Sequence, residues 1–125
     1  MIVDTDVLVW ELSGNEKAKR LIHSLIPFHI SVVTYVELIQ GMRNKREQQL
    51  LSHQLARWNV RIIHIDQDIS ARAMIYVEEY ALSHSMELAD ALIAASCIST
   101  SEELVTANEK HYRHIPNITL STFKP

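Results

Sequence analysis

The chain has 125 residues, of which 47% are hydrophobic and 22% charged, so it has the size and composition of one compact domain, residues 1–125. Its 15 acidic and 12 basic residues give a net charge of -3, which excludes a generally basic surface for nucleic acid or membranes. Only two glycines are present, which excludes the glycine-rich loops of Rossmann and P-loop nucleotide sites.

Short runs rich in β-branched residues alternate with longer amphipathic segments along the chain. The short runs predict strands at residues 2–3, 28–33, 62–65, 104–105 and 118–120. The longer segments predict helices over about 16–26, 35–57 with a break near Asn44, 69–83, 87–98 and, in a short piece, 109–114. Each crossover returns the chain to begin another strand in the same direction. We therefore expect an α/β fold in which a mainly parallel sheet lies between two layers of helices.

The cellular compartment is indicated by the cysteine count and by the apolar runs. Cys97 is the sole cysteine, which excludes an intrachain disulfide and a cysteine-based zinc cluster and favours a reducing compartment. The opening residues carry an acid, Asp4, where a signal peptide has positive charge and then an apolar run. No apolar stretch approaches the roughly 20 residues of a membrane span. We expect a soluble, cytoplasmic protein with no membrane partner.

Polar side chains follow three of the predicted strands. Asp4 and Asp6 come after the first strand, Glu37 after the second, and Thr106 and Asn108 after the fourth. In an open parallel sheet, ligands bind beyond the carboxyl ends of the strands. These residues are therefore candidates for a functional site at that edge.

Helix capping offers a structural explanation for the same positions, because a strand-to-helix junction needs an oxygen for the free backbone N–H groups. Thr34-x-x-Glu37 and Thr106-x-x-Glu109 both fit the capping-box pattern. Either aspartate after the first strand can cap the next helix. Capping and function both stay open at each position.

Asp90 is the acidic residue that capping does not explain. Residues 87–98 are apolar on nearly every face, so this helix is expected in the buried cover of the sheet. An ionised carboxylate there costs several kcal/mol unless a charge, hydrogen bonds or a metal compensates. The helix carries no Lys or Arg, so the partner is a metal ion or an arginine from elsewhere. Glu87, one turn earlier, supplies a second carboxylate or a favourable charge at the helix N-terminus.

If Asp4, Glu37, Asp90 and Asn108 converge, they form a pocket of oxygen ligands with three negative charges. Such a donor set suits Mg²⁺ or Mn²⁺, whereas zinc prefers nitrogen or sulfur. Like charges repel one another without an ion, which strengthens the expectation of a cation. The chemistry expected of such a pocket is metal-assisted hydrolysis of a phosphodiester.

The basic residues are concentrated in residues 42–61, which have a net charge of +4 and leave -7 for the remainder of the chain. Charge runs of this kind are usually solvated helix faces. Contact with phosphate groups is the sharper interpretation, and Arg43, Lys45 and Arg46 are the candidate residues. Binding to a protein partner or to a second copy is a further alternative.

Three other features are assigned to packing. His111-x-x-His114 has the spacing of metal ligands on a helix, but we expect surface or packing histidines. Cys97, inside an apolar helix, is expected to be a core residue. The Trp and Tyr residues form no aromatic platform visible in the sequence, so base stacking is not assigned.

Four segments that combine an apolar run with candidate site residues occur in order along most of the chain. They are Ile2-Val3-Asp4-Thr5-Asp6-Val7-Leu8-Val9, residues 31–41 with the acid Glu37, Asp90-Ala91-Leu92-Ile93-Ala94-Ala95, and residues 104–112 with Thr106 and Asn108. Together they resemble the motifs of the PIN-domain ribonucleases, and more narrowly those of the VapC toxins of bacterial toxin–antitoxin pairs. The order and spacing of all four make the resemblance specific, although any one alone is weak.

The resemblance implies an α/β/α domain with a Mg²⁺ or Mn²⁺ site that cleaves single-stranded RNA. By position it implies the metal ligands Asp4, Glu37 and Asp90, the fourth catalytic residue Asn108, and the supporting residues Asp6 and Thr106, to which we add Glu87. Asn108 keeps a ligating oxygen but removes a charge, which leaves the occupancy of a second metal position open.

The resemblance also implies partners. It predicts an RNA substrate, a VapB-like antitoxin that blocks the site, and a homodimer. Arg43, Lys45 and Arg46 are then candidate contacts to the RNA backbone.

Two other interpretations stay open. Asp4-Thr5-Asp6-Val7 after a strand also resembles the nucleophile motif of haloacid-dehalogenase-type phosphatases, in which Asp4 attacks phosphorus and Asp6 is the acid and base. The short chain, the lack of a clear downstream lysine and paired-acid motif, and Asp90 argue against it. The second alternative is a degenerate PIN domain that binds a partner and whose acids only cap helices.

Overall fold

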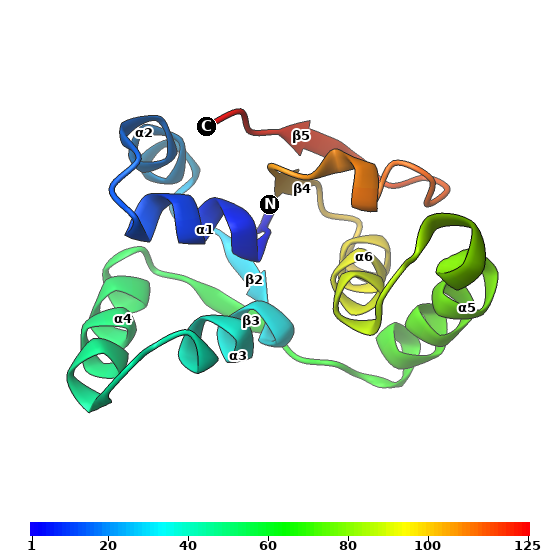
Figure 1. Ribbon diagram of the computed structural model, residues 1–125, viewed down its shortest axis with the longest axis horizontal. Helices are drawn as coiled ribbons and strands as arrows, with labels where there is room; N and C mark the ends of the chain where they lie inside the picture. Colours follow the sequence, from blue (N-terminus) through cyan, green and yellow to red (C-terminus); the bar gives the residue numbers. More distant parts are fainter.

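The computed structural model describes residues 1–125 and contains one five-stranded sheet (Figure 1). Every strand pair is parallel, and the strands are arranged in the order β3-β2-β1-β4-β5. The strands are β1 (Ile2–Val3), β2 (His29–Ser31), β3 (Arg61–Ile63), β4 (Leu104–Thr106) and β5 (Leu120–Thr122). The expected α/β fold with a parallel sheet is confirmed.

Helices cover both faces of this sheet. The four helices between β1 and β3 contribute to one layer, and the two helices between β3 and β4 form the other (Figure 1). The helices are α1 (Thr5–Leu12), α2 (Glu16–Leu25), α3 (Val32–Gln40), α4 (Lys45–Arg57), α5 (Gln67–His84) and α6 (Leu88–Thr100), with a 3₁₀ turn, η1 (Glu109–His111), after β4. No helix is long and apolar enough to cross a bilayer.

Alternate side chains of the two central strands enter two separate hydrophobic cores. Val3 of β1 and Val105 of β4 pack with residues of α1, α2 and α4. Ile2 and Leu104, their neighbours, pack with residues of α5 and α6 on the other face. The strands are therefore buried on both sides, as a three-layer fold requires.

The order of the strands creates a crevice beside β1. The chain builds β2 and β3 on one side of β1 and then crosses to place β4 on its other side. At such a switch point the connections leave the two neighbouring strands toward opposite faces, which opens a crevice at their carboxyl ends. Asp4 follows β1 directly and Thr106 ends β4, so both lie at this crevice.

Most predicted elements agree with the structure to within three residues at each end, and the predicted break near Asn44 is confirmed because Asn44 caps α4. Helix α1 was not predicted, because Val7 to Trp10 form a continuous apolar run without helical periodicity. The strand predicted over 28–33 ends at Ser31, whose hydroxyl accepts a hydrogen bond from the Val33 N–H and begins α3.

Both predicted capping boxes are wrong. Thr34 lies inside α3, because Ser31 already caps that helix. Thr106 ends β4, and its hydroxyl donates to Asp4 instead of capping η1. Asp4 itself is the N-cap of α1 and accepts the Thr5 N–H at 2.8 Å. The cap and the candidate site residue are thus the same side chain.

Candidate active site

Four carboxylates from distant parts of the chain line one hollow at the carboxyl end of the sheet. This carboxylate pocket has a volume of about 430 Å³ and contains no Lys or Arg. Its lining residues are Asp4, Thr5, Asp6, Val9, Trp10, Glu37, Asp90, Asn108 and His111. The four predicted catalytic residues Asp4, Glu37, Asp90 and Asn108 are therefore brought together.

Asp4 is buried at the carboxyl end of β1 and is held by the neighbouring strand β4 and by the first turn of α1. Its Oδ2 accepts the Thr106 hydroxyl at 2.8 Å, and that hydroxyl accepts the Asn108 N–H at 3.0 Å. Asp6, two residues after Asp4 and in the first turn of α1, accepts the Ala107 N–H at 3.2 Å. The end of β4 is therefore attached to α1 by two carboxylates, which supports the predicted roles of Asp6 and Thr106 as hydrogen-bonding groups.

Glu37 reaches the pocket from the second turn of α3. Its Oε1 accepts the Thr5 hydroxyl at 2.7 Å, and the same Thr5 oxygen lies 2.9 Å from the hydroxyl of Thr34. Thr5 and Thr34, neither of which was predicted as a site residue, thus connect the first turns of α1 and α3. The signal available in the sequence is their position, directly after Asp4 and one turn before Glu37.

Asp90 is paired with consecutive residues of the segment that follows β4, and not with an arginine. Its Oδ1 accepts the Tyr112 hydroxyl at 3.1 Å. Its Oδ2 lies 3.0 Å from Nδ1 of His111, whose side chain is 51% exposed. The arginine that the sequence left open is absent. The expectation of surface or packing histidines agrees with His114, which stacks on His84, and with His111, which is exposed but also lines the pocket.

Burial raises the pKa values of Asp4 and Asp6, and charge repulsion adds to the effect at Asp4. Burial, and then the charge of Asp6, raise the pKa of Asp4 to about 7. Burial also raises the pKa of Asp6, against the lowering effect of the Ala107 N–H. Because no lysine or arginine lines the pocket, its negative charge is not compensated by a permanently charged side chain.

The donor set fits a hard cation. All four acids and Asn108 offer oxygen atoms, which Mg²⁺ and Mn²⁺ prefer. No group of three His, Cys, Asp or Glu side chains is arranged closely enough to hold an ion as the side chains stand. Each carboxylate instead has at least one oxygen bonded to a protein donor. Ion binding therefore requires side-chain adjustment within a pocket whose charge and ligand chemistry are suitable.

Glu87 lies beside the pocket but does not line it. It is the exposed N-cap position of α6 and makes no capping hydrogen bond. With His84 and His111 it lines a neighbouring hollow of about 300 Å³, which shares Asp90 with the carboxylate pocket.

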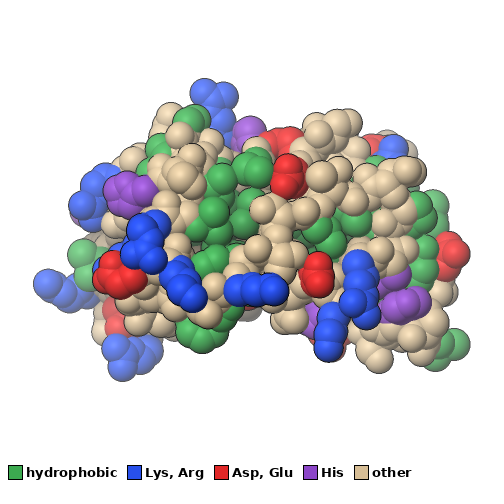
Figure 2. Space-filling view, turned by 90° about the horizontal axis from the view of Figure 1, so that it is seen from above, with side chains coloured by type: hydrophobic (Ala, Val, Ile, Leu, Met, Phe, Trp, Pro, Cys, Tyr) green, Lys and Arg blue, Asp and Glu red, His purple; other side chains and the backbone are tan.

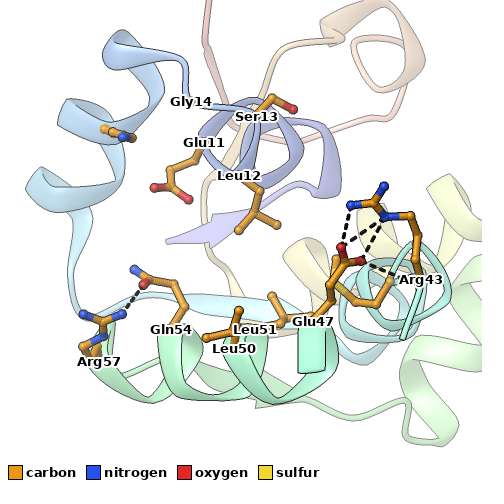
Figure 3. Close-up of a pocket in the computed structure, with 13 residues that line it drawn as sticks. Glu11, Leu12, Ser13, Gly14, Arg43, Glu47, Leu50, Leu51, Gln54 and Arg57 are labelled. Atoms are coloured by element: carbon orange, nitrogen blue, oxygen red, sulfur yellow. Dashed lines mark hydrogen bonds and ion pairs between the residues drawn. The ribbon is translucent and has the colours of Figure 1, made fainter. Parts of the chain in front are cut away.

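A larger groove of about 700 Å³ lies between α1 and α4 (Figure 3). A small hollow that contains Val9, Leu12, Glu37 and Met42 connects it to the carboxylate pocket, because residues are shared at both ends. Figure 3 places Leu12 of α1 opposite Leu50, Leu51 and Gln54 of α4, with Arg43 at one end and Arg57 at the other. We call this the α1–α4 groove.

The three predicted RNA contacts are placed differently with respect to this groove. Arg43 lines it, and its guanidinium is bonded to Glu47 at 2.7 Å. Lys45 and Arg46 lie exposed in the first turn of α4 and do not line it. Two further cations, Lys19 and Arg57, line the groove.

On the face seen in Figure 2, lysine and arginine side chains are spread over the left side and along the lower edge, with apolar side chains exposed between them. They do not form one continuous basic surface there. This distribution agrees with the net charge of -3, which predicts local contacts to a polyanion.

Comparison with known proteins agrees with this geometry. The model of the PIN domain family matches residues 1–116. The chain belongs to the PIN-domain family. Among the curated relatives, Ribonuclease VapC10 of Mycobacterium tuberculosis is 34% identical over 120 residues, which cover 90% of this chain and 85% of that protein. Ribonuclease VapC1 of Methanocaldococcus jannaschii is 27% identical over 124 residues, which cover 98% and 86%.

A solved structure gives the same result for this PIN domain. A chain of a toxin–antitoxin complex from Klebsiella pneumoniae is 30% identical, with a TM-score of 0.80, and the match covers 97% of this chain and 95% of that one. The predicted VapC-type PIN domain is therefore confirmed. The family assignment sets aside the haloacid-dehalogenase interpretation of Asp4 and Asp6.

The pKa of Asp4 predicts the pH dependence of stability in the metal-free PIN domain. Its folded-state pKa of about 7 lies above the ordinary 3.8. The preference for the neutral carboxyl therefore stabilises the fold fully below about pH 4 and is lost as the pH rises through 7. The difference between the two pKa values corresponds to roughly 4 kcal/mol.

We expect Asp4→Asn to remove this dependence. In urea unfolding with a chelator, the free energy of unfolding of the variant should rise relative to wild type between pH 4 and pH 8. Glu78→Gln, at an exposed position of α5, is the control. Its free energy of unfolding should not rise relative to wild type between the two pH values. A difference between Asp4→Asn and wild type that is the same at both pH values contradicts the assignment.

Proposed function

We propose that this PIN domain is a Mg²⁺- or Mn²⁺-dependent endoribonuclease and the toxin of a toxin–antitoxin pair. The observation that carries the proposal is the carboxylate pocket, in which four acids meet without a lysine or arginine. Family membership and the ribonuclease names of the relatives support the substrate class.

Asp4, Glu37 and Asp90 are the residues that we propose as metal ligands. They approach from three separate elements, the end of β1, α3 and the first turn of α6. A divalent ion bound there supplies a water molecule of lowered pKa and offsets the charge that develops on the cleaved phosphate. Burial, and then the charge of Asp6, raise the pKa of Asp4, and a cation held by these residues would offset the second effect.

The other polar residues of the pocket keep this arrangement in place. The Thr5 hydroxyl donates to one oxygen of Glu37 and leaves the other free to turn toward a ligand, whereas Asp4 accepts bonds on both oxygens, from Thr106 and from the Thr5 N–H. Asn108 lies at the exposed mouth of the pocket, where its amide can contact the substrate phosphate without adding a fourth repelling charge to the ligand set. Water and the phosphodiester are then the only reactants that the hydrolysis consumes.

Trp10 supports a single-stranded substrate. Its side chain lines the carboxylate pocket and is 41% exposed. An exposed indole offers a stacking face for a base next to the cleaved bond, which a base paired in a duplex cannot reach. The sequence alone did not reveal this, because the other aromatic residues are far from Trp10 along the chain.

The α1–α4 groove is the continuation of the pocket along which we place the RNA backbone. Lys19, Arg43 and Arg57 line the groove. Lys45 and Arg46 project from the start of α4 and can contact phosphates beyond it. The Glu47 pair reduces the charge that Arg43 offers to RNA.

The partner assignments extend the same proposal. The match to a chain of a toxin–antitoxin complex supports a VapB-like antitoxin that covers the catalytic pocket. A homodimer and a cytoplasmic location stay predictions. The remaining alternative is a degenerate PIN domain, which the next experiment distinguishes.

We expect Asp90→Asn to reduce RNA cleavage by more than about 100-fold, because it removes a metal ligand at nearly constant volume. The assay uses a panel of single-stranded RNAs with Mg²⁺ or Mn²⁺ and a chelator control. Asp68→Asn, an exposed acid of α5, is the matched variant and should cleave like wild type. Unchanged cleavage by Asp90→Asn rejects the site. A wild-type protein that binds no Mn²⁺ and cuts no RNA favours the degenerate domain.

Removal of three basic residues tests the RNA path. In an Asp90→Asn background, replacement of Arg43, Lys45 and Arg46 by Ala should weaken RNA binding and reduce the slope of log K against log salt by up to about 2. Arg72, Arg113 and Lys124, which line neither the groove nor the pocket, provide a control triple of the same charge. Equal salt slopes for the two triple variants contradict the proposed path.

A further inference from the structure

Tyr112 is a buried polar side chain that reaches the floor of the carboxylate pocket from the core below. Its side chain is fully buried, and its ring packs in the second hydrophobic core with residues such as Ile2, Leu104 and Ile115. Its hydroxyl donates to Oδ1 of Asp90 at 3.1 Å. The same hydroxyl interacts with Asp4 and lowers its pKa, against the effect of burial. The phenol hydroxyl is therefore bonded to one of the proposed metal ligands and lies close enough to a second to lower its pKa.

The phenol remains a donor under all ordinary conditions. Burial, and then the charges of Asp4 and Asp90, raise the pKa of Tyr112 far above its usual value. A neutral donor lowers the cost of holding two carboxylates close together but does not cancel their charge, as a lysine or arginine does. The pocket thus keeps its attraction for a cation.

The direction of this hydrogen bond is fixed by packing. The Tyr112 ring is enclosed by the core under β1 and β4, so the hydroxyl cannot move without disturbing that core. His111, the preceding residue, is half exposed and approaches the other oxygen of Asp90. The two oxygens of Asp90 therefore have one buried and one exposed partner, and a cation can displace the exposed one without disturbing the core.

We propose that Tyr112 is a positioning residue, whose hydroxyl fixes the carboxylate of Asp90 relative to that of Asp4 so that both can bind one divalent ion. The inference rests on the proposed function, because it assigns a role toward the proposed metal. Groups that hydrogen bond to metal ligands commonly change metal affinity by 10- to 100-fold when they are removed.

Tyr112→Phe removes the hydroxyl and keeps the ring. We expect the dissociation constant for Mn²⁺, measured by electron paramagnetic resonance, to rise about tenfold or more. The Mn²⁺ concentration that gives half-maximal RNA cleavage should rise by the same factor. Tyr80→Phe is the matched control, since Tyr80 packs against the same core but does not line the carboxylate pocket, and its Mn²⁺ affinity should equal that of wild type.

The outcomes separate the two levels of the account. Wild-type binding of Mn²⁺ with equal affinity in Tyr112→Phe overturns the role of Tyr112 and leaves the proposed function standing. Absence of Mn²⁺ binding in wild type overturns the proposed function itself. Urea unfolding establishes that each variant is folded.

A second measurement needs no variant. The Tyr112 hydroxyl proton, shielded from solvent and bonded to Asp90, should give an NMR resonance in the metal-free protein that shifts when Mg²⁺ is added. An unchanged resonance at a Mg²⁺ concentration that saturates cleavage overturns the proposal.

Discussion

Repulsion among carboxylates at the end of a parallel sheet is the interaction on which this structure depends. Asp4, Asp6, Glu37 and Asp90 line one pocket, and no lysine or arginine joins them. The protein holds the acids with neutral donors: the hydroxyls of Thr5, Thr106 and Tyr112 and the N–H of Ala107. These bonds reduce the cost of the arrangement without removing its charge, and the charge is what a divalent ion would use.

The topology of the sheet explains why residues so distant in sequence meet there. The strand order reverses beside β1, so the carboxyl ends of β1 and β4 lie next to each other. Helices from both layers begin near this edge of the sheet. Helix α3 presents Glu37 from one layer, and α6 presents Asp90 from the other. The crevice that results continues into the α1–α4 groove, which gives a linear polymer a path across the surface.

The sequence predicted the fold class and the convergence of four site residues because both depend on patterns that tertiary structure rarely overrides. Alternation of strands and helices specifies the parallel sheet, and an acid inside an apolar helix, Asp90, needs a polar partner. Helix α1 was missed because its exposed face carries Val9 and Trp10, apolar residues that hide the helical period. Those same residues line the pocket, so the irregular pattern reflects the site.

The partners of Asp90 could not be predicted from the sequence. A tyrosine and a histidine that follow a strand are ordinary packing residues until the direction of the side chains is known, and here the two consecutive residues divide between core and solvent. The capping alternative for Thr34 and Thr106 failed for a related reason, since Thr34 bonds to Thr5 of α1 and Thr106 bonds to Asp4 at the end of β1. Local patterns predict local hydrogen bonds, and the site is built from non-local ones.

The most direct measurement is anomalous X-ray diffraction from crystals of this PIN domain grown with Mn²⁺. The account predicts a manganese peak inside the carboxylate pocket, with oxygen atoms of Asp4, Glu37 and Asp90 at roughly 2.0–2.3 Å from it. A well-ordered pocket with no peak at saturating Mn²⁺, or an ion bound elsewhere while these three side chains keep their present partners, would contradict the account.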